Sequence, residues 1–320
     1  MAIALPTDDG TAARQITPQL RSTQARIREL AARKNAVILA HIYQRLEVQE
    51  VADFIGDSLN LSREAQKTKA DIIVFCGVHF MAETAKLLSP TRTVLLPDMK
   101  AGCGMADMIT GDLARGFRER YPGRPLVSYV NTYAEVKAES DICCTSTNAV
   151  KIVRSLPDEE VLFAPDKFLG AYVQKHVPEK KLICWDGYCP THFVIRPEMV
   201  LARKALSPDA LVLAHPECSP EVLELADFVG STQSIMDFAG ASKHREFIIL
   251  TEAGLLLRLK DLHPDKRFYS IAPCPHCPYM KFVELEKVLA CLEGDLNPIE
   301  IPTDTMLRAR TSIERMMAVV

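Results

Sequence analysis

The sequence has no long hydrophobic run and no block of positive charge. Its longest apolar runs have the length of a β-strand, such as residues 36–40, so we expect no transmembrane span. Lysine and arginine occur in runs of at most two, and the net charge is −3 with a pI near 6.3. These values argue against a nucleic acid or a membrane as a partner. Residues 1–23 lack the charged start and apolar core of a signal peptide, which predicts a cytoplasmic location.

The ten cysteines are not expected to form disulfides, because thiols in the cytosol stay reduced. Four of them occupy apolar strand patterns, a helical pattern or the start of a turn, where cysteine behaves as a small buried hydrophobe: Cys76, Cys184, Cys291 and Cys143. Three others lie in loops beside glycine or proline, each just after an expected strand: Cys103, Cys189 and Cys277. Loops at strand ends carry function more often than packing, so these three are candidate functional residues.

Three stretches of the chain align without a gap and repeat the same polar positions. They begin at His41, Tyr129 and His215, which are 88 and 86 residues apart, and the loop cysteines follow 62, 60 and 62 residues later. At 320 residues and 48% hydrophobic content, the chain can bury two or three cores, and the repeat favours three units around one shared site. The expected divisions are an N-terminal tail at 1–18, units at 19–112 and 113–197, and a third unit with C-terminal helices at 198–320.

Each unit alternates apolar strand patterns with helical ones. The expected strands are 36–41, 72–76 and 93–96 in the first unit, 126–130, 161–164 and 182–185 in the second, and 211–215, 247–250 and 268–271 in the third. The intervening helices include 19–34, 47–53, 61–69, 81–88, 148–154, 168–176, 233–239 and 253–262. This pattern predicts an α/β fold of three αβα domains with parallel sheets, whose ligands bind beyond the carboxyl ends of the strands.

A hydroxyl-bearing turn follows the first strand of each unit. The turns are Asp57-Ser58, Thr145-Ser146 and Ser231-Thr232, and each precedes a helical pattern. Ordinary helix capping explains any one of them. Three in register at the expected binding edge favour sites for a carboxylate or phosphate at helix N-termini. Ser58, Ser146 and Thr232 are therefore candidate anion-binding residues.

Paired polar residues mark the end of each first strand. A single histidine there is more often structural than catalytic, but three pairs converging on one cavity favour general acid–base chemistry. The pairs are His41 with Tyr43, Tyr129 with Asn131, and His215 with Glu217. The other repeated acids are expected to serve helix starts and packing: Glu47, Glu135, Glu221, Asp53, Asp141 and Asp227.

The cysteines bear on the cofactor. Cys274 and Cys277 form a CxxC, which alone would indicate zinc or redox chemistry, but no second CxxC completes a zinc ribbon. One thiolate from each unit could instead hold an iron–sulfur cluster, leaving one iron free to act as a Lewis acid. Spacing favours Cys277 over Cys274 as the third ligand. Two alternatives stay open: a structural or sensor protein that binds zinc or a regulatory cluster, and an aconitase-like hydro-lyase.

At this point the motifs match a known family. The chain resembles quinolinate synthase over nearly its whole length, from about residue 38 to 280. The matching motifs are Ala40-His41-Ile42-Tyr43 with Glu47-Val48-Gln49, Gly56-Asp57-Ser58, Met99-Lys100-Ala101-Gly102-Cys103, Tyr129-Val130-Asn131-Thr132, Cys144-Thr145-Ser146, Trp185-Asp186-Gly187-Tyr188-Cys189 with His192, Ala214-His215-Pro216-Glu217-Cys218, and Cys277-Pro278-Tyr279-Met280.

The resemblance implies a pseudo-threefold arrangement of the three domains around a 4Fe-4S cluster held by Cys103, Cys189 and Cys277. The implied reaction is a transferase step of NAD (pyridine nucleotide) biosynthesis, in which iminoaspartate and dihydroxyacetone phosphate give quinolinate, phosphate and two waters. A functional coupling to L-aspartate oxidase is a further implied partnership. The substrate-binding residues carried over are His41, Ser58, Tyr129, Asn131, Ser146, His215, Glu217 and Thr232. The catalytic set is Glu217, His215, Tyr43 and Tyr129.

One position departs from part of the family. Some members carry CxxCxxC near the last ligand, whereas this chain has Met280 at the third position. A Cys274–Cys277 bond is then the one local disulfide that the sequence allows.

Overall fold

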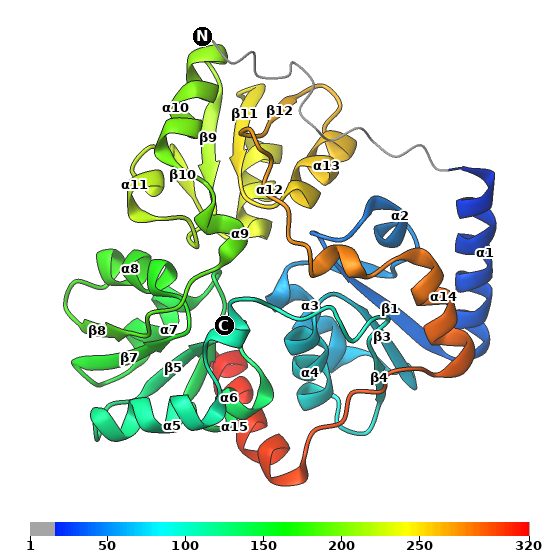
Figure 1. The fold of residues 1–320 in the computed structure, drawn as a ribbon, viewed down its shortest axis with the longest axis horizontal. Coiled ribbons are helices and arrows are strands. Elements are labelled where there is room, and N and C mark those ends of the chain that lie inside the picture. The colour runs from blue at the N-terminus through cyan, green and yellow to red at the C-terminus, as the bar shows by residue number, and fades with distance from the viewer. Residues whose placement is uncertain (1–16, 320) are drawn as a thin grey trace.

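The computed structural model describes residues 17–319 and contains three four-stranded parallel sheets. Their strand orders are β2-β1-β3-β4, β6-β5-β7-β8 and β10-β9-β11-β12, so the same topology occurs three times. Figure 1 shows the three sheets with their helices arranged around a common centre. The predicted fold class is therefore confirmed. Most of the expected tail at 1–18 lies outside the described residues.

The first unit begins with a helix whose N-terminus is marked by capping residues in the sequence. Thr17 accepts the Leu20 N–H at 3.3 Å and Pro18 fills the first turn, where a missing N–H costs nothing. Its elements are α1 (Pro18–Arg33), β1 (Ala36–His41), α2 (Leu46–Gln49), β2 (Phe54–Gly56), α3 (Ser58–Lys67), β3 (Ile72–Cys76), α4 (His79–Leu88), β4 (Thr93–Leu95) and η1 (Ala106–Met108).

The other two units repeat this plan. The second contains α5 (Gly111–Arg120), β5 (Leu126–Tyr129), α6 (Ala134–Ala138), β6 (Ile142–Cys144), α7 (Ala149–Ser155), β7 (Glu160–Ala164), α8 (Lys167–His176), β8 (Lys181–Cys184) and α9 (Pro190–Phe193). The third contains α10 (Pro197–Leu206), β9 (Leu211–Ala214), α11 (Pro220–Leu223), β10 (Phe228–Val229), α12 (Thr232–Ala241), β11 (Glu246–Leu250), α13 (Ala253–Leu262), β12 (Arg267–Tyr269) and η2 (Met280–Phe282).

Each unit has one more strand than the sequence predicts. The extra strands β2, β6 and β10 are two or three residues long, too short to show a periodic pattern. An aspartate just before each one accepts the backbone N–H of the neighbouring first strand: Asp53 from Ile38, Asp141 from Leu126 and Asp227 from Val212, each at 2.7 Å. The packing role predicted for the three aspartates is confirmed.

The C-terminal helices pack mainly on the first two units. The apolar face of α14 (Leu285–Gly294) joins the same hydrophobic cluster as α1, and α15 (Thr303–Val319) contacts α6, β6 and α4. Between these helices, the Ile299 N–H donates to the Val94 carbonyl at 2.8 Å beside the first sheet. The segment after the third unit therefore ties the first two units together (Figure 1). We propose that the domains divide near residues 112 and 197, which leaves each sheet within one unit.

A buried charge also links the first two units. Glu83 on α4 is 8% exposed, and its carboxylate accepts the Ala134 N–H of α6 at 2.8 Å. The Lys137 ammonium is fully buried, attracts this carboxylate, and donates to the Thr132 carbonyl beside Asn131. Burial raises the pKa of Glu83 and lowers that of Lys137, and the attraction between the two groups offsets part of this cost. Their hydrogen bonds to Ala134 and Thr132 hold the Asn131 loop against the first unit.

We expect Glu83→Ala to lower the free energy of unfolding by about 3 kcal/mol, because it leaves the Lys137 ammonium buried without its counter-charge. Urea denaturation of the folded protein measures this difference. The matched control is Glu64→Ala, which removes a partly exposed carboxylate 3.5 Å from the exposed Lys67 and should cost about 0.5 kcal/mol or less. Equal losses in the two variants would contradict a structural role for the buried pair.

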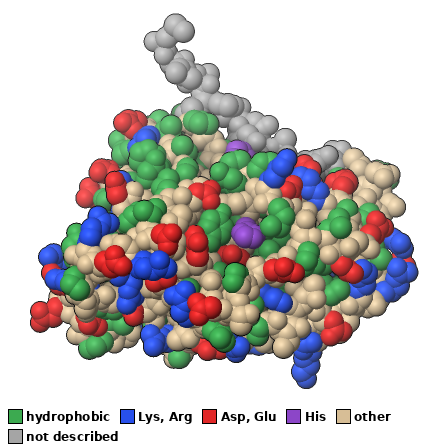
Figure 2. Space-filling model, turned by 60° about the horizontal axis from the view of Figure 1, so that its bottom comes forward, with side chains coloured by type: hydrophobic (Ala, Val, Ile, Leu, Met, Phe, Trp, Pro, Cys, Tyr) green, Lys and Arg blue, Asp and Glu red, His purple; other side chains and the backbone are tan. Residues whose placement is uncertain are grey.

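The outer surface carries mixed charge. Acidic and basic side chains are interspersed over the face shown in Figure 2. Among the described residues, no helix has both the length and the apolar character needed to cross a membrane.

Candidate active site

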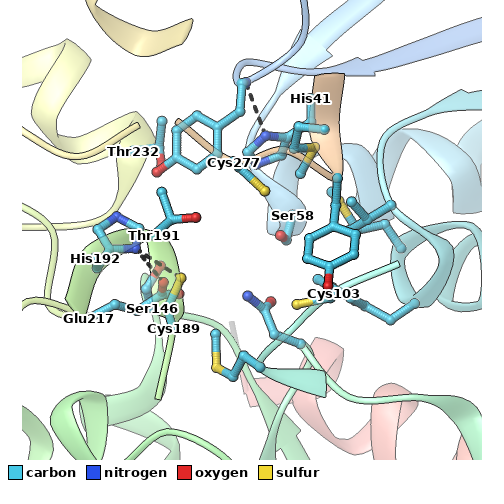
Figure 3. A pocket seen from close by; sticks show the side chains of 18 of the residues that line it. His41, Ser58, Cys103, Ser146, Cys189, Thr191, His192, Glu217, Thr232 and Cys277 are labelled. Atoms are coloured by element: carbon cyan, nitrogen blue, oxygen red, sulfur yellow. Dashed lines mark hydrogen bonds and ion pairs between the residues drawn. The ribbon is translucent and has the colours of Figure 1, made fainter. Parts of the chain in front are cut away.

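A cavity with about 790 Å³ of empty space, part of it open to solvent, lies where the carboxyl ends of the three sheets meet. Figure 3 shows the labelled side chains pointing into it from all three units. The structure brings every predicted site residue to its lining: His41, Tyr43, Ser58, Cys103, Tyr129, Asn131, Ser146, Cys189, His215, Glu217, Thr232 and Cys277. Cys274 is not among the described lining residues and instead accepts a hydrogen bond from the Ser270 hydroxyl at 2.9 Å.

Two histidines at strand ends are held neutral. His41 follows the apolar run of β1, and its ring meets the Tyr43 ring edge-on with centroids 4.6 Å apart. Burial, with the Lys281 charge nearby, lowers the pKa of His41 to about 3. Burial likewise lowers the pKa of His215 to about 4, despite the opposing charge of Glu217. Both imidazoles are therefore uncharged near neutral pH and can each donate or accept a hydrogen bond.

In two of the hydroxyl-bearing turns, one residue caps the following helix and the next residue lines the cavity. The Asp57 carboxylate caps α3 by accepting the Asn60 N–H at 3.0 Å, and the Ser231 hydroxyl caps α12 by accepting the Ser234 N–H at 3.3 Å. Ser58 and Thr232, the first residues of these ten-residue helices, line the cavity. Their hydroxyls and the helix N-termini form a favourable environment for an anion.

The turn of the second unit differs. Asn148 precedes α7, and its side chain accepts the Thr145 N–H at 2.6 Å, so the turn folds back on itself. Ser146 still lines the cavity. The helix that follows has only seven residues, which gives this position a weaker dipole than the other two.

A continuous chain of hydrogen bonds connects two tyrosines through all three units. The Tyr129 hydroxyl donates to Glu217 Oε1 at 2.6 Å, and His192 Nδ1 lies 2.8 Å from Glu217 Oε2. His192 Nε2 lies 2.8 Å from the Thr251 hydroxyl, which is 2.6 Å from the Tyr43 hydroxyl. Burial raises the pKa of both tyrosines, so they are neutral hydroxyls that can each donate or accept a hydrogen bond at the ends of this chain.

Sequence reasoning missed two members of this chain. His192 appears in the Trp185–His192 motif but received no role, and Thr251, at the end of β11, received none either. The signal that could have pointed to His192 is its place in the sequence, three residues after the candidate ligand Cys189. Thr251 lies after the third strand of its unit, where the repeat offers no registered polar residue, so no signal pointed to it.

Glu217 is the electrostatic centre of the cavity. It is 3% exposed, and burial alone would favour its protonated form. The neighbouring His192, together with the hydrogen bonds from His192 and Tyr129, outweighs burial and holds the pKa of this carboxyl well below its usual range. The group is therefore a carboxylate that can accept a proton when the chain of hydrogen bonds rearranges.

The comparisons with known proteins agree on one family. A model of the Quinolinate synthetase A protein family matches residues 25–318. The chain belongs to this family. It is 52% identical over 298 residues to quinolinate synthase of Thermodesulfovibrio yellowstonii, covering 93% of this chain and 98% of that protein. It is 53% identical over 293 residues to quinolinate synthase of Pelobacter propionicus, covering 92% and 96%. It is 52% identical over 294 residues to quinolinate synthase 1 of Methanosarcina acetivorans, with the same coverage.

For a member of the quinolinate synthetase A family, the donor set of the cavity suits a cationic cluster. Cys103, Cys189 and Cys277 come from three units, and Figure 3 shows their sulfurs on different sides of the central space. Burial, with Cys277 and Glu217 nearby, raises the pKa of Cys103 to about 12, and burial raises the pKa of the other two thiols as well. Thiolates form in such surroundings when a metal compensates their charge.

A second donor set overlaps with this one. The ligand atoms of Cys189, His192 and Glu217 all lie within 4.8 Å of one another. Sulfur, imidazole nitrogen and carboxylate oxygen are all zinc ligands. However, His192 and Glu217 already hold each other and Tyr129 in the chain of hydrogen bonds. The cavity therefore offers two overlapping donor sets, the three cysteines and this trio, and the donor set of three thiols is compatible with an iron–sulfur cluster.

Proposed function

We propose that this protein condenses iminoaspartate with dihydroxyacetone phosphate to give quinolinate, phosphate and two waters, as a transferase of NAD biosynthesis. The observation that carries the proposal is the convergence of three units on one cavity that combines hydroxyl groups at helix N-termini, a chain of hydrogen bonds and three thiols. Its family membership and the names of its relatives support the same product.

The substrates match the polar groups of the cavity. Iminoaspartate has two carboxylates and the triose has one phosphate, and the cavity offers hydroxyls at Ser58, Ser146 and Thr232. His41 and Asn131 supply further hydrogen-bonding groups, and the buried Asn131 Oδ1 has no protein partner among the described residues. An unpartnered buried carbonyl oxygen is costly, so a donor on a bound substrate is expected there.

In the proposed reaction, the residues in the chain of hydrogen bonds carry out the proton transfers. Ring formation with loss of water requires protons to leave carbon and nitrogen and reach departing hydroxyls. In this proposal, Glu217 and the neutral His215 move protons on the side of Tyr129. Tyr43, on the opposite side, assists ring closure.

The proposed cofactor is a 4Fe-4S cluster on Cys103, Cys189 and Cys277. When bound, it would supply a Lewis-acidic iron for the loss of water. The residues around it exclude bulk water and orient the substrates. An L-aspartate oxidase is the proposed source of the imine.

The test is product formation by protein that is purified and assayed without oxygen. Oxaloacetate, ammonia and dihydroxyacetone phosphate are supplied together, and quinolinate is identified by mass spectrometry. We expect quinolinate with all three components and none when any one is omitted. Turnover of a single substrate without the triose would instead favour a hydro-lyase.

We expect Ser58→Ala to raise the KM of one substrate by about tenfold with little change in kcat, because one hydrogen bond to an anion is lost. Steady-state kinetics with each substrate varied in turn identify which anion this hydroxyl binds. Thr110→Ala is the matched control, since its hydroxyl caps α5 on the outer surface. A product complex in which Ser146 and Thr232 both lie far from the carboxylates would overturn the assignment of the turns as anion sites.

A further inference from the structure

A buried carboxylate lies beside Thr251 at the junction of the first and third units. Glu252 is 0% exposed and caps α13 by accepting the Gly254 N–H at 2.6 Å. It also accepts the backbone N–H of Cys277 at 3.2 Å. A fully buried carboxylate is costly unless donors and a counter-charge surround it, so the partners of Glu252 are tightly constrained.

The counter-charge of Glu252 comes from the segment that follows Cys277. Lys281 Nζ lies 2.9 Å from Glu252 Oε1, and the same ammonium donates to the backbone carbonyl of Tyr43. Arg45, two residues after Tyr43, donates to the Lys281 carbonyl from Nε at 3.1 Å and from Nη2 at 2.9 Å. The turn that carries Tyr43 is therefore bound to the loop that carries Cys277 from both directions.

The backbones of the two units also touch directly. A Cβ added at Gly254 would lie 2.7 Å from Tyr43 Cα and 2.8 Å from the Ile42 carbonyl oxygen. Both are backbone atoms, which cannot rotate away as a side chain can. The start of α13 therefore approaches the Tyr43 backbone as closely as a glycine allows.

We infer that Glu252 and Lys281 are positioning residues that set Tyr43 in register with the Cys277 loop. Neither side chain is among the described residues that line the cavity, so each would act through the groups it holds. Lys281 fixes the Tyr43 carbonyl, while the adjacent Thr251 fixes the Tyr43 hydroxyl at 2.6 Å. The inference rests on the proposed function in one respect, the role of Tyr43 in the reaction.

The test compares Lys281→Met with Lys281→Arg and Gly254→Ala. We expect Lys281→Met to lower kcat about 10- to 100-fold with both KM values within about threefold, because a displaced reacting group slows the chemical step. Lys281→Arg should recover part of kcat, since it keeps the charge and a donor. Gly254→Ala keeps the ion pair but pushes α13 away from Tyr43, so it should also lower kcat.

A second readout does not depend on activity. Hydrogen–deuterium exchange of the protein, with and without its cluster, should become faster in Lys281→Met in peptides covering residues 42–46 and 277–282. The matched control is Lys287→Met, which also breaks an ion pair between the C-terminal segment and the first unit, with Nζ 2.7 Å from Asp98 Oδ2. Because Lys287 Nζ also donates to the Phe282 carbonyl at 2.9 Å, inside the second peptide, the control is read on kcat and on the 42–46 peptide, and both should stay unchanged.

The outcomes separate the inference from the proposed function. Normal kcat and normal exchange in folded Lys281→Met would overturn the inference. So would a loss of kcat that Lys287→Met shares in proportion to its loss of thermal stability. If the wild-type protein forms no quinolinate, the proposed function fails, and the exchange experiment alone decides whether Lys281 holds the Tyr43 turn.

Discussion

Glu217→Gln is expected to lower kcat for quinolinate formation by about 1,000-fold while both KM values stay within a few-fold. The carboxylate accepts the Tyr129 hydroxyl at 2.6 Å and meets His192 Nδ1 at 2.8 Å. An amide has nearly the same shape, so substrates should still bind. It cannot take up a proton, and its NH₂ group would face one of these donors, so proton movement between Tyr129 and His192 stops. Steady-state kinetics with each substrate varied in turn measure the split between kcat and KM.

The matched control for this variant is Glu221→Gln. Its carboxylate lies four residues further along the chain and is exposed, outside the cavity lining. We expect its kcat to stay within about twofold of wild type, as for a surface substitution without a special role. Normal turnover in Glu217→Gln would reject the proposed role of the carboxylate. A large rise in KM with kcat unchanged would reassign Glu217 to substrate binding alone.

If the proposed cluster is present, anaerobically purified wild-type protein will be brown and contain iron. Cys103→Ser, Cys189→Ser and Cys277→Ser are each expected to lose this colour, most of the iron and at least 1,000-fold in activity. Three thiols, one from each unit, line the cavity, and the loss of one leaves two ligands for the proposed cluster. Visible absorbance, iron and sulfide analysis, and the quinolinate assay give three readouts on the same preparations.

Cys274→Ser is the matched control for these variants, because it alters the same loop three residues before Cys277. The Cys274 thiol accepts a hydrogen bond from Ser270 and is not among the described lining residues. Its colour and iron content should therefore match wild type. If Cys274→Ser loses the cluster and Cys277→Ser retains it, the third ligand is Cys274 and not Cys277. A colourless protein that carries zinc would favour the trio of Cys189, His192 and Glu217.

Much of the fold was accessible from the sequence because its signals are local and repeated. Strands such as β1 are continuous apolar runs, and the interval between His41, Tyr129 and His215 revealed three equivalent units. The edge strands β2, β6 and β10 were missed because two or three residues carry no periodicity. The packing of α14 and α15 on the first two units was also missed, because an amphipathic pattern shows that a helix has a partner but not which one.

For the candidate site, too, residues marked by the repeat could be predicted, and residues whose partners lie in other units could not. Residues at registered positions, such as Ser58 and Thr232, could be predicted because the repeat marks them three times. Thr251, Glu252 and Lys281 could not, because their partners come from other units and only the assembled structure shows their proximity. The sequence also offered two uses for the hydroxyl turns. The structure gives capping to Asp57 and Ser231 and leaves Ser58 and Thr232 at the cavity.

The most direct test of the central claim is a time course in which quinolinate and inorganic phosphate are measured in the same anaerobic reaction. If one cavity joins iminoaspartate to dihydroxyacetone phosphate, wild-type protein will release the two products in a one-to-one ratio from the first turnovers onward. Glu217→Gln will slow both to the same extent. Phosphate release without quinolinate, or quinolinate formation that does not require the triose phosphate, would contradict the account.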